Sequence, residues 1–139
     1  MRRAFLLVPT TVLLLGAGDA DKDTKQLQGT WSVVMAKFGG KKVPENKLKD
    51  VKVIFQGNMM TLQYGKEEKG TFKLDPSKKP KAMDVTLERK GKKETALFIY
   101  ELNGDNLKLC WRKPGGERPT SFTVKDTDGA MVLKRSKKD

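Results

Sequence analysis

Short runs of alternating apolar and polar residues, separated by turn signals, cover most of the chain after residue 28. In Met83–Glu88 and Leu107–Arg112 the apolar side chains occupy every second position. A period of two is typical of a β-strand that buries one face, and no long segment shows the period of an amphipathic helix. The sequence therefore predicts an all-β domain.

The turn signals divide this domain into eight or nine strands. Gly57-Asn58, Asn103-Gly104 and Asp128-Gly129 are dipeptides typical of hairpin turns, and a charged turn surrounds Gly91. Up-and-down closure into a small antiparallel barrel of about eight strands leaves no strand edge unpaired. One helical turn is expected within residues 43–50. The expected strands lie near residues 31–35, 51–56, 60–64, 71–75, 83–88, 96–100, 107–112, 122–124 and 131–135.

The first twenty residues are predicted to be a secretory signal peptide. Arg2 and Arg3 form a positive start, residues 4–15 are mostly apolar, and small residues precede a cut after Ala20. A cut after Ala17 is the alternative, and an uncleaved membrane anchor or a buried N-terminal helix are the competing structural interpretations. We expect residues 21–139 to form the barrel domain of an exported protein, periplasmic or extracellular.

The composition argues against catalysis and metal binding. Histidine is absent, which removes the commonest general base and metal ligand. Cys110 is the single cysteine, and we expect a buried structural thiol there rather than a reactive one. The acidic residues fall mostly in turns or at outward positions, without the converging pair that glycoside hydrolysis needs. We therefore expect no catalytic residue, no metal site and no cofactor; the carboxylates considered are Asp75, Asp84, Glu88, Glu94, Glu101 and Asp105.

The chain is strongly basic, with a net charge of +12. Its 29 basic residues are 23 Lys and 6 Arg, and lysine is a hydrated point charge that suits a solubilising surface better than base recognition. Nucleic acid is therefore not an expected partner. Two lysine clusters, Lys78–Lys81 and Lys90–Lys93, fall in predicted turns and are candidates for contact with an anionic envelope polymer or protein.

The stretch Leu27–Trp31, LQGTW, places a tryptophan at the start of the first strand. We expect its indole to close one end of the barrel, and Gly29 to let the entering backbone pass close beneath it. Arg135 lies on the last strand, which is next to the first strand in a closed barrel. A cation–π contact between the Arg135 guanidinium and the Trp31 ring would stabilise the closure by about 0.5–2 kcal/mol.

A G-x-W motif on the first strand with a basic residue on the last resembles the lipocalin and wider calycin pattern. The segments LQGTWSVV, GKKVP, DPSKKPKAMD, YELNGDNLKLC and ERPTSF further resemble a family of lipocalin-like domains abundant in planctomycete bacteria. That resemblance covers about residues 24–135. The family has no assigned activity, so the resemblance implies a lipocalin-like fold and export. It assigns Gly29, Trp31 and Arg135 to structural closure of the barrel and no residue to catalysis.

The alternation also predicts which side chains point into the barrel. In one interpretation the protein holds a small hydrophobic ligand in an apolar cup, with Tyr100 and Trp111 near its mouth. In the other, side chains fill the barrel and the lysine-rich loops bind an anionic partner. The candidate lining of the cup is Met35, Phe55, Leu62, Phe98, Tyr100 and Trp111; the full inward set adds Trp31, Val33, Phe72, Val85 and Leu109.

Overall fold

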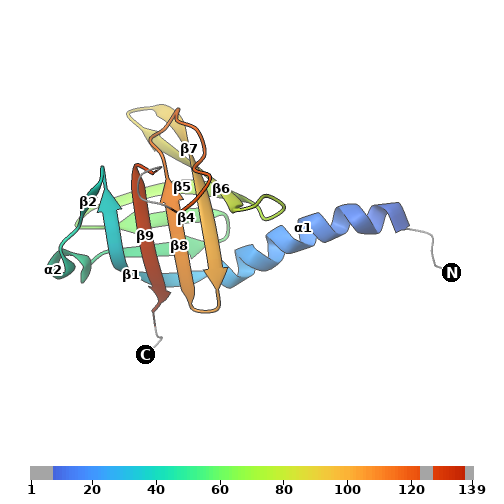
Figure 1. The fold of residues 1–139 in the computed structure, drawn as a ribbon, viewed down its shortest axis with the longest axis horizontal. Coiled ribbons are helices and arrows are strands. Elements are labelled where there is room, and N and C mark those ends of the chain that lie inside the picture. The colour runs from blue at the N-terminus through green and yellow to red at the C-terminus, as the bar shows by residue number, and fades with distance from the viewer. Residues whose placement is uncertain (1–7, 123–126, 137–139) are drawn as a thin grey trace.

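The computed structural model describes residues 8–122 and 127–136 of the chain. Helix α1 projects from the strands, with its N-terminal part away from the barrel (Figure 1). No helix among the described residues is long and apolar enough to cross a membrane. The elements are α1 (Val8–Leu27), β1 (Gly29–Phe38), β2 (Lys41–Lys42), α2 (Glu45–Leu48), β3 (Lys52–Gln56), β4 (Met59–Gln63), β5 (Glu67–Asp75), β6 (Lys81–Arg89), β7 (Lys92–Asn103), β8 (Asn106–Trp111) and β9 (Gly129–Arg135).

Eight of the described strands close into an antiparallel barrel, which confirms the predicted fold class (Figure 1). Their order is β1-β3-β4-β5-β6-β7-β8-β9, and β9 pairs back onto β1, while β2 pairs only with the end of β1. The predicted turns at Gly57, Gly91 and Gly104 join β3 to β4, β6 to β7 and β7 to β8. The strand expected at residues 122–124 is not formed at Phe122, and its remainder lies outside the described residues.

A β-bulge in β1 changes which of its side chains face the interior. The register of β1 on β9 shifts between Val33 and Met35. After the shift Ala36 is the buried residue, with 1% of its surface exposed, while Met35 is partly exposed on the outer face. The expectation that Met35 points into the barrel is therefore wrong, because alternation from Trp31 holds only as far as the bulge. The bulge also keeps Lys37 out of the interior, where an unpaired charge would be costly.

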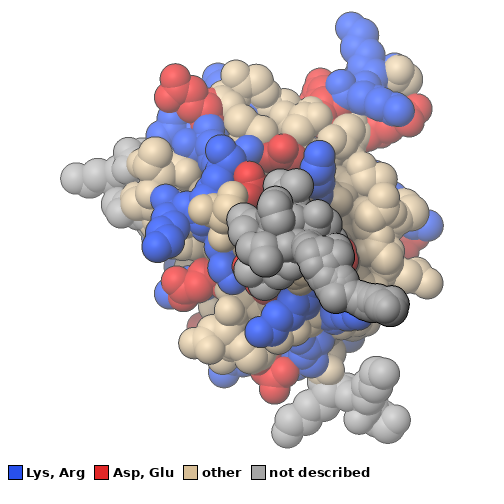
Figure 2. All heavy atoms as spheres, turned by 90° about the vertical axis from the view of Figure 1, so that its right-hand side faces the viewer, with Lys and Arg blue, Asp and Glu red and all other residues tan. Residues whose placement is uncertain are grey.

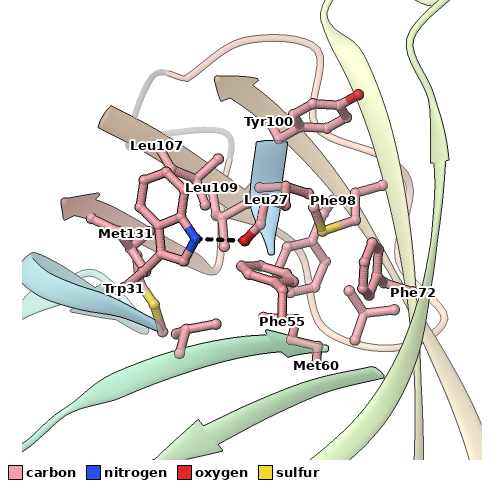
Figure 3. Packing of buried hydrophobic residues seen from close by; sticks show 14 of the residues in the cluster. Leu27, Trp31, Phe55, Met60, Phe72, Phe98, Tyr100, Leu107, Leu109 and Met131 are labelled. Atoms are coloured by element: carbon pink, nitrogen blue, oxygen red, sulfur yellow. Dashed lines mark hydrogen bonds between the residues drawn. The ribbon is translucent and has the colours of Figure 1, made fainter. Parts of the chain in front are cut away.

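The half of the barrel next to α1 is filled by its own apolar side chains (Figure 3). Trp31, Phe55, Leu107 and Leu109 are each at most 1% exposed. Phe55 and Phe72 pack edge to face, with their ring centroids 5.2 Å apart. The interior of a small eight-stranded barrel is just wide enough for side chains to fill, so this half is a packed core.

A second apolar cluster lies on the outer face of β7, β8 and β9. It contains Ile99, Cys110 and Ala130, and Phe122 from the β8–β9 connection packs against them. The run 96–100 is therefore covered on both faces at Ile99. Burial raises the pKa of the Cys110 thiol to about 11, so this thiol stays protonated and weakly nucleophilic at neutral pH.

Candidate functional site

The last turn of α1 seals one end of the barrel. The final carbonyl groups of a helix have no partner within the helix, and here the barrel supplies several of the missing donors. The Trp31 Nε1–H donates to the Leu27 carbonyl at 2.8 Å, the dashed line in Figure 3, and Arg135 donates to the Gln26 carbonyl. The Gln28 backbone N–H donates to the Lys25 carbonyl, and the Gln28 side-chain amide donates to the Thr24 carbonyl. Trp31 therefore fixes the helix end as well as filling the core.

Arg135 connects α1 to the first and last strands of the barrel. Its guanidinium lies 4.4 Å from the centroid of the Trp31 ring, and the two residues are register partners across β1 and β9. The contact expected from the sequence is thus present. Arg135 also donates from Nη1 to the Gln28 carbonyl at 2.9 Å and from Nε to the Asp105 carboxylate at 3.0 Å.

Gly29 is needed for its backbone conformation. Its φ of 116° is one that residues with a Cβ rarely adopt. A Cβ built there would meet Arg135 Nη1 at 3.7 Å, which is ordinary contact. The close passage of backbone beneath Trp31 that the sequence suggested is therefore not what requires glycine at this position.

A buried acidic residue ties α1 to β6 and β7. Asp23 is 6% exposed, and its carboxylate accepts a hydrogen bond from Tyr100 Oη at 2.7 Å and forms an ion pair with Lys81 Nζ at 3.1 Å. Burial, and then the adjacent carboxylate, raise the pKa of Tyr100, so its hydroxyl remains a donor. Tyr100 is 1% exposed and belongs to the sealed end, whereas the sequence suggested a place near an open mouth.

The opposite end of the barrel carries a row of aromatic side chains. Phe98, Trp111, Gly129 and Phe38 are successive register partners across β7, β8, β9 and β1, and directly paired residues face the same side of a sheet. The Trp111 ring stacks on Phe98 with centroids 4.9 Å apart and lies 5.8 Å from the Phe38 ring. Phe98 is 7% exposed, Trp111 is partly exposed and Phe38 is 44% exposed. We call Phe98, Trp111 and Phe38 the aromatic row.

Gly129 makes room for the middle ring of this row. A Cβ at Gly129 would lie 2.2 Å from Cε2 and 2.5 Å from Nε1 of Trp111, so the indole rests against the bare backbone of β9. Near the same end, Leu48 of α2 is buried in the core. Leu62 and Leu87 are partly exposed and pack against this core. At this end Trp111 and Phe38 leave part of their ring surface exposed next to the buried Phe98.

The structure separates the six predicted lining residues into three groups. Phe55 and Tyr100 lie in the sealed core, and Met35 lies outside the barrel. Leu62, Phe98 and Trp111 lie toward the end opposite α1, and of these only Phe98 and Trp111 are in ring contact. Sequence reasoning missed Phe38 because strict alternation from Trp31 assigns it to the outer face. The one available signal was Lys37, which the same alternation would have buried.

The two predicted lysine clusters lie only partly in turns. Lys78 and Lys79 are in the exposed β5–β6 loop at the end sealed by α1, while Lys81 begins β6 and is partly exposed. Lys90 is in the β6–β7 turn at the opposite end, while Lys92 and Lys93 are exposed residues at the start of β7. Figure 2 shows the side from which α1 projects, where Lys and Arg side chains cover much of the surface with acidic side chains between them. The positive charge is thus spread over both ends of the barrel.

The described residues contain no group of His, Cys, Asp or Glu side chains arranged to hold a metal ion. Comparisons of the chain with models of protein families, with curated proteins and with solved structures found no match. We therefore infer the function from the barrel, its sealed end and the aromatic row.

Proposed function

We propose that this protein is an exported, non-catalytic binding module that holds a small apolar ligand against the aromatic row. The graded exposure of that row carries the proposal: Phe98 is buried beneath Trp111, and Phe38 stands open beside it. Offset stacking contributes about 0.5–1.5 kcal/mol per ring pair beyond the burial of apolar surface. A flat apolar ligand can continue this stack without displacing core side chains.

The filled interior favours a shallow site over a deep one. Leu109 and Phe55 are at most 1% exposed, and protein cores are packed as densely as organic crystals. A ligand at their level would have to displace several buried side chains. The proposed ligand therefore contacts Phe98 and Trp111 from the expected cup lining, together with Phe38, and leaves Phe55 and Tyr100 in the core.

Export and membership of the lipocalin-like family abundant in planctomycete bacteria belong to the same proposal. The closing contact between Trp31 and Arg135 supports the family assignment, because it gives the G-x-W motif and the basic residue of the last strand one shared role. The position of the seal supports cleavage after Ala20. Asp23 and Leu27 follow that cut, so a processed chain keeps the contacts that close the barrel.

The second candidate function is an interaction domain that binds an anionic envelope partner through its lysine-rich loops. The packed core next to α1 favours it, because a filled barrel needs no internal ligand. The exposed lysines of the two clusters then supply the contacts; they are Lys78, Lys79, Lys90, Lys92 and Lys93. Binding of a soluble polyanion such as polyphosphate should weaken steeply with salt, as expected for exposed charges.

The test of the first function is a fluorescence titration with N-phenyl-1-naphthylamine, a neutral apolar probe that brightens in apolar surroundings. The variant Phe38→Ser plus Trp111→Leu removes two rings of the aromatic row. The control, Val34→Ser plus Met59→Ser, removes two exposed apolar side chains elsewhere on the barrel. We expect saturable binding by the wild type and the control, and a loss of affinity of about tenfold or more in the first variant.

Equal probe affinity in the wild type and in the Phe38→Ser plus Trp111→Leu variant would overturn the first function. The same holds for a wild-type protein that fails to bind the probe at all. In the latter case, salt-sensitive polyphosphate binding that falls when Lys78, Lys79, Lys92 and Lys93 are replaced by Gln would support the second function.

A further inference from the structure

A cleft of about 270 Å³ lies at the end of the barrel opposite the aromatic row, along the end of β7. It arises because β7 runs on to Asn103, whereas its pairing with β6 ends at Lys81 and Tyr100. The β5–β6 loop therefore stands away from the end of β7 and leaves a gap. The loop prolines Pro76 and Pro80 line one part of this gap.

The cleft combines apolar walls with free positive charge. Leu102 and Phe122 contribute apolar surface, and Lys78 and Lys79 contribute two ammonium groups. Neither lysine forms an ion pair among the residues that the structure describes. A site with apolar walls and exposed ammonium groups that form no ion pair is complementary to an anion that carries an apolar body.

Two acidic groups lie near the cleft, and hydrogen bonds from Ser77, followed by the charge of Lys78, lower the pKa of the Asp75 carboxyl. The Asp75 carboxylate accepts hydrogen bonds from the Ser77 backbone N–H at 3.2 Å and from its hydroxyl at 2.5 Å. Glu101 lies 3.9 Å from Lys108 Nζ. Lys81, a third lysine of the cleft, forms its ion pair with Asp23, so the charge available to a ligand is that of Lys78 and Lys79.

We propose that this cleft is a binding site for a small amphipathic anion. A carboxylate of the ligand meets the ammonium groups of Lys78 and Lys79, and an aromatic or similarly flat apolar body lies against Leu102 and Phe122. The volume is just below the range of about 300–1,000 Å³ typical of sites for drug-sized ligands, so the ligand is of fragment size. The site is separate from the aromatic row and goes beyond the function proposed for it.

The test follows amide and side-chain NMR shifts of the protein during titration with naphthalene-2-carboxylate. Naphthalene-2-carboxamide is the matched neutral probe, and inorganic phosphate is the probe that has charge without an apolar body. The variant Lys78→Gln plus Lys79→Gln removes the two cations of the cleft. The matched control, Lys92→Gln plus Lys93→Gln, removes the same charge at the opposite end of the barrel.

We expect the carboxylate to shift resonances of Leu102 and of the β5–β6 loop. Both other probes should bind at least about tenfold more weakly than the carboxylate. The Lys78→Gln plus Lys79→Gln variant should lose about the same factor in affinity, and the Lys92→Gln plus Lys93→Gln control should keep wild-type affinity. As a charge reversal, Lys78→Glu plus Lys79→Glu should bind 2-naphthylmethylammonium in place of the carboxylate. Both lysines are exposed, so these variants should remain folded.

Three results would overturn the site. The first is equal binding of the carboxylate and the carboxamide, and the second is equal binding of the carboxylate and phosphate. The third is a set of shifts confined to Trp111 and its neighbours, which would place the probe at the aromatic row and leave the function proposed there intact.

Discussion

Replacement of Gly129 by alanine tests the geometry of the aromatic row. The added Cβ would lie 2.2–2.5 Å from three atoms of the Trp111 indole, so the ring must move. The backbone itself should accept alanine, because Gly129 is not among the glycines with positive φ. Displacing the indole disturbs its stack on Phe98 at 4.9 Å and its contact with Phe38 at 5.8 Å. At about 0.5–1.5 kcal/mol for each ring pair, the expected loss is about 1–3 kcal/mol, which is also typical of overpacking.

Urea unfolding followed by circular dichroism measures this loss as a lower midpoint at an unchanged slope. The decisive comparison repeats Gly129→Ala in a Trp111→Ala background. Without the indole the three atoms nearest to the added methyl group are gone, so the substitution should then change the free energy of unfolding by less than about 0.5 kcal/mol. An equal loss of stability in both backgrounds would contradict a clash between the added methyl group and the indole, as would no loss in the wild type.

Three further predictions concern the seal and the outer cluster. Tyr100→Phe removes a donor to the buried Asp23 and should lower the free energy of unfolding by about 1–3 kcal/mol. The control Tyr64→Phe, at an exposed site, should have little effect. Equal effects of the two substitutions in urea unfolding would contradict the role of the seal. A chain that begins at residue 21 should keep its thermal stability, and one that begins at residue 28, without Leu27, should lose at least about 3 kcal/mol. Burial raises the pKa of Cys110 from 9.0 to about 11. The neutral thiol therefore stabilises the fold fully below pH 9 and loses this contribution as the pH rises through 11. The stability difference between wild type and Cys110→Ala should shrink over that window, and a constant difference would contradict the shift.

Local patterns predict the strands and most turns of this barrel. Segments such as Met83–Glu88 alternate because one face packs on the core, and glycine at positions such as Gly91 and Gly104 supplies the positive φ that hairpin turns need. The contact between Trp31 and Arg135 also follows from the sequence, because closure of an up-and-down barrel places the first strand next to the last.

Features that depend on tertiary contacts escape such reasoning. The bulge after Val33 has no signal at its own position, because only Lys37, further along the strand, conflicts with strict alternation; the bulge decides that Phe38 joins the aromatic row while Met35 leaves the interior. Asp23 belongs to a charged segment that resembles a solvated lead-in, and its burial requires α1 to pack against Tyr100 of β7. The candidate site was therefore predictable in its residue types, but its position depended on an irregular strand and on a helix from outside the barrel.

The location of a bound apolar molecule tests the central claim most directly. Intermolecular nuclear Overhauser effects between N-phenyl-1-naphthylamine and the protein report which side chains lie within about 5 Å of the probe. We expect effects to ring protons of Trp111 and Phe38, with none to Phe55 or Leu109 in the packed core. Effects to Phe55 and Leu109 would show a ligand deep in the barrel and would contradict the shallow site at the aromatic row.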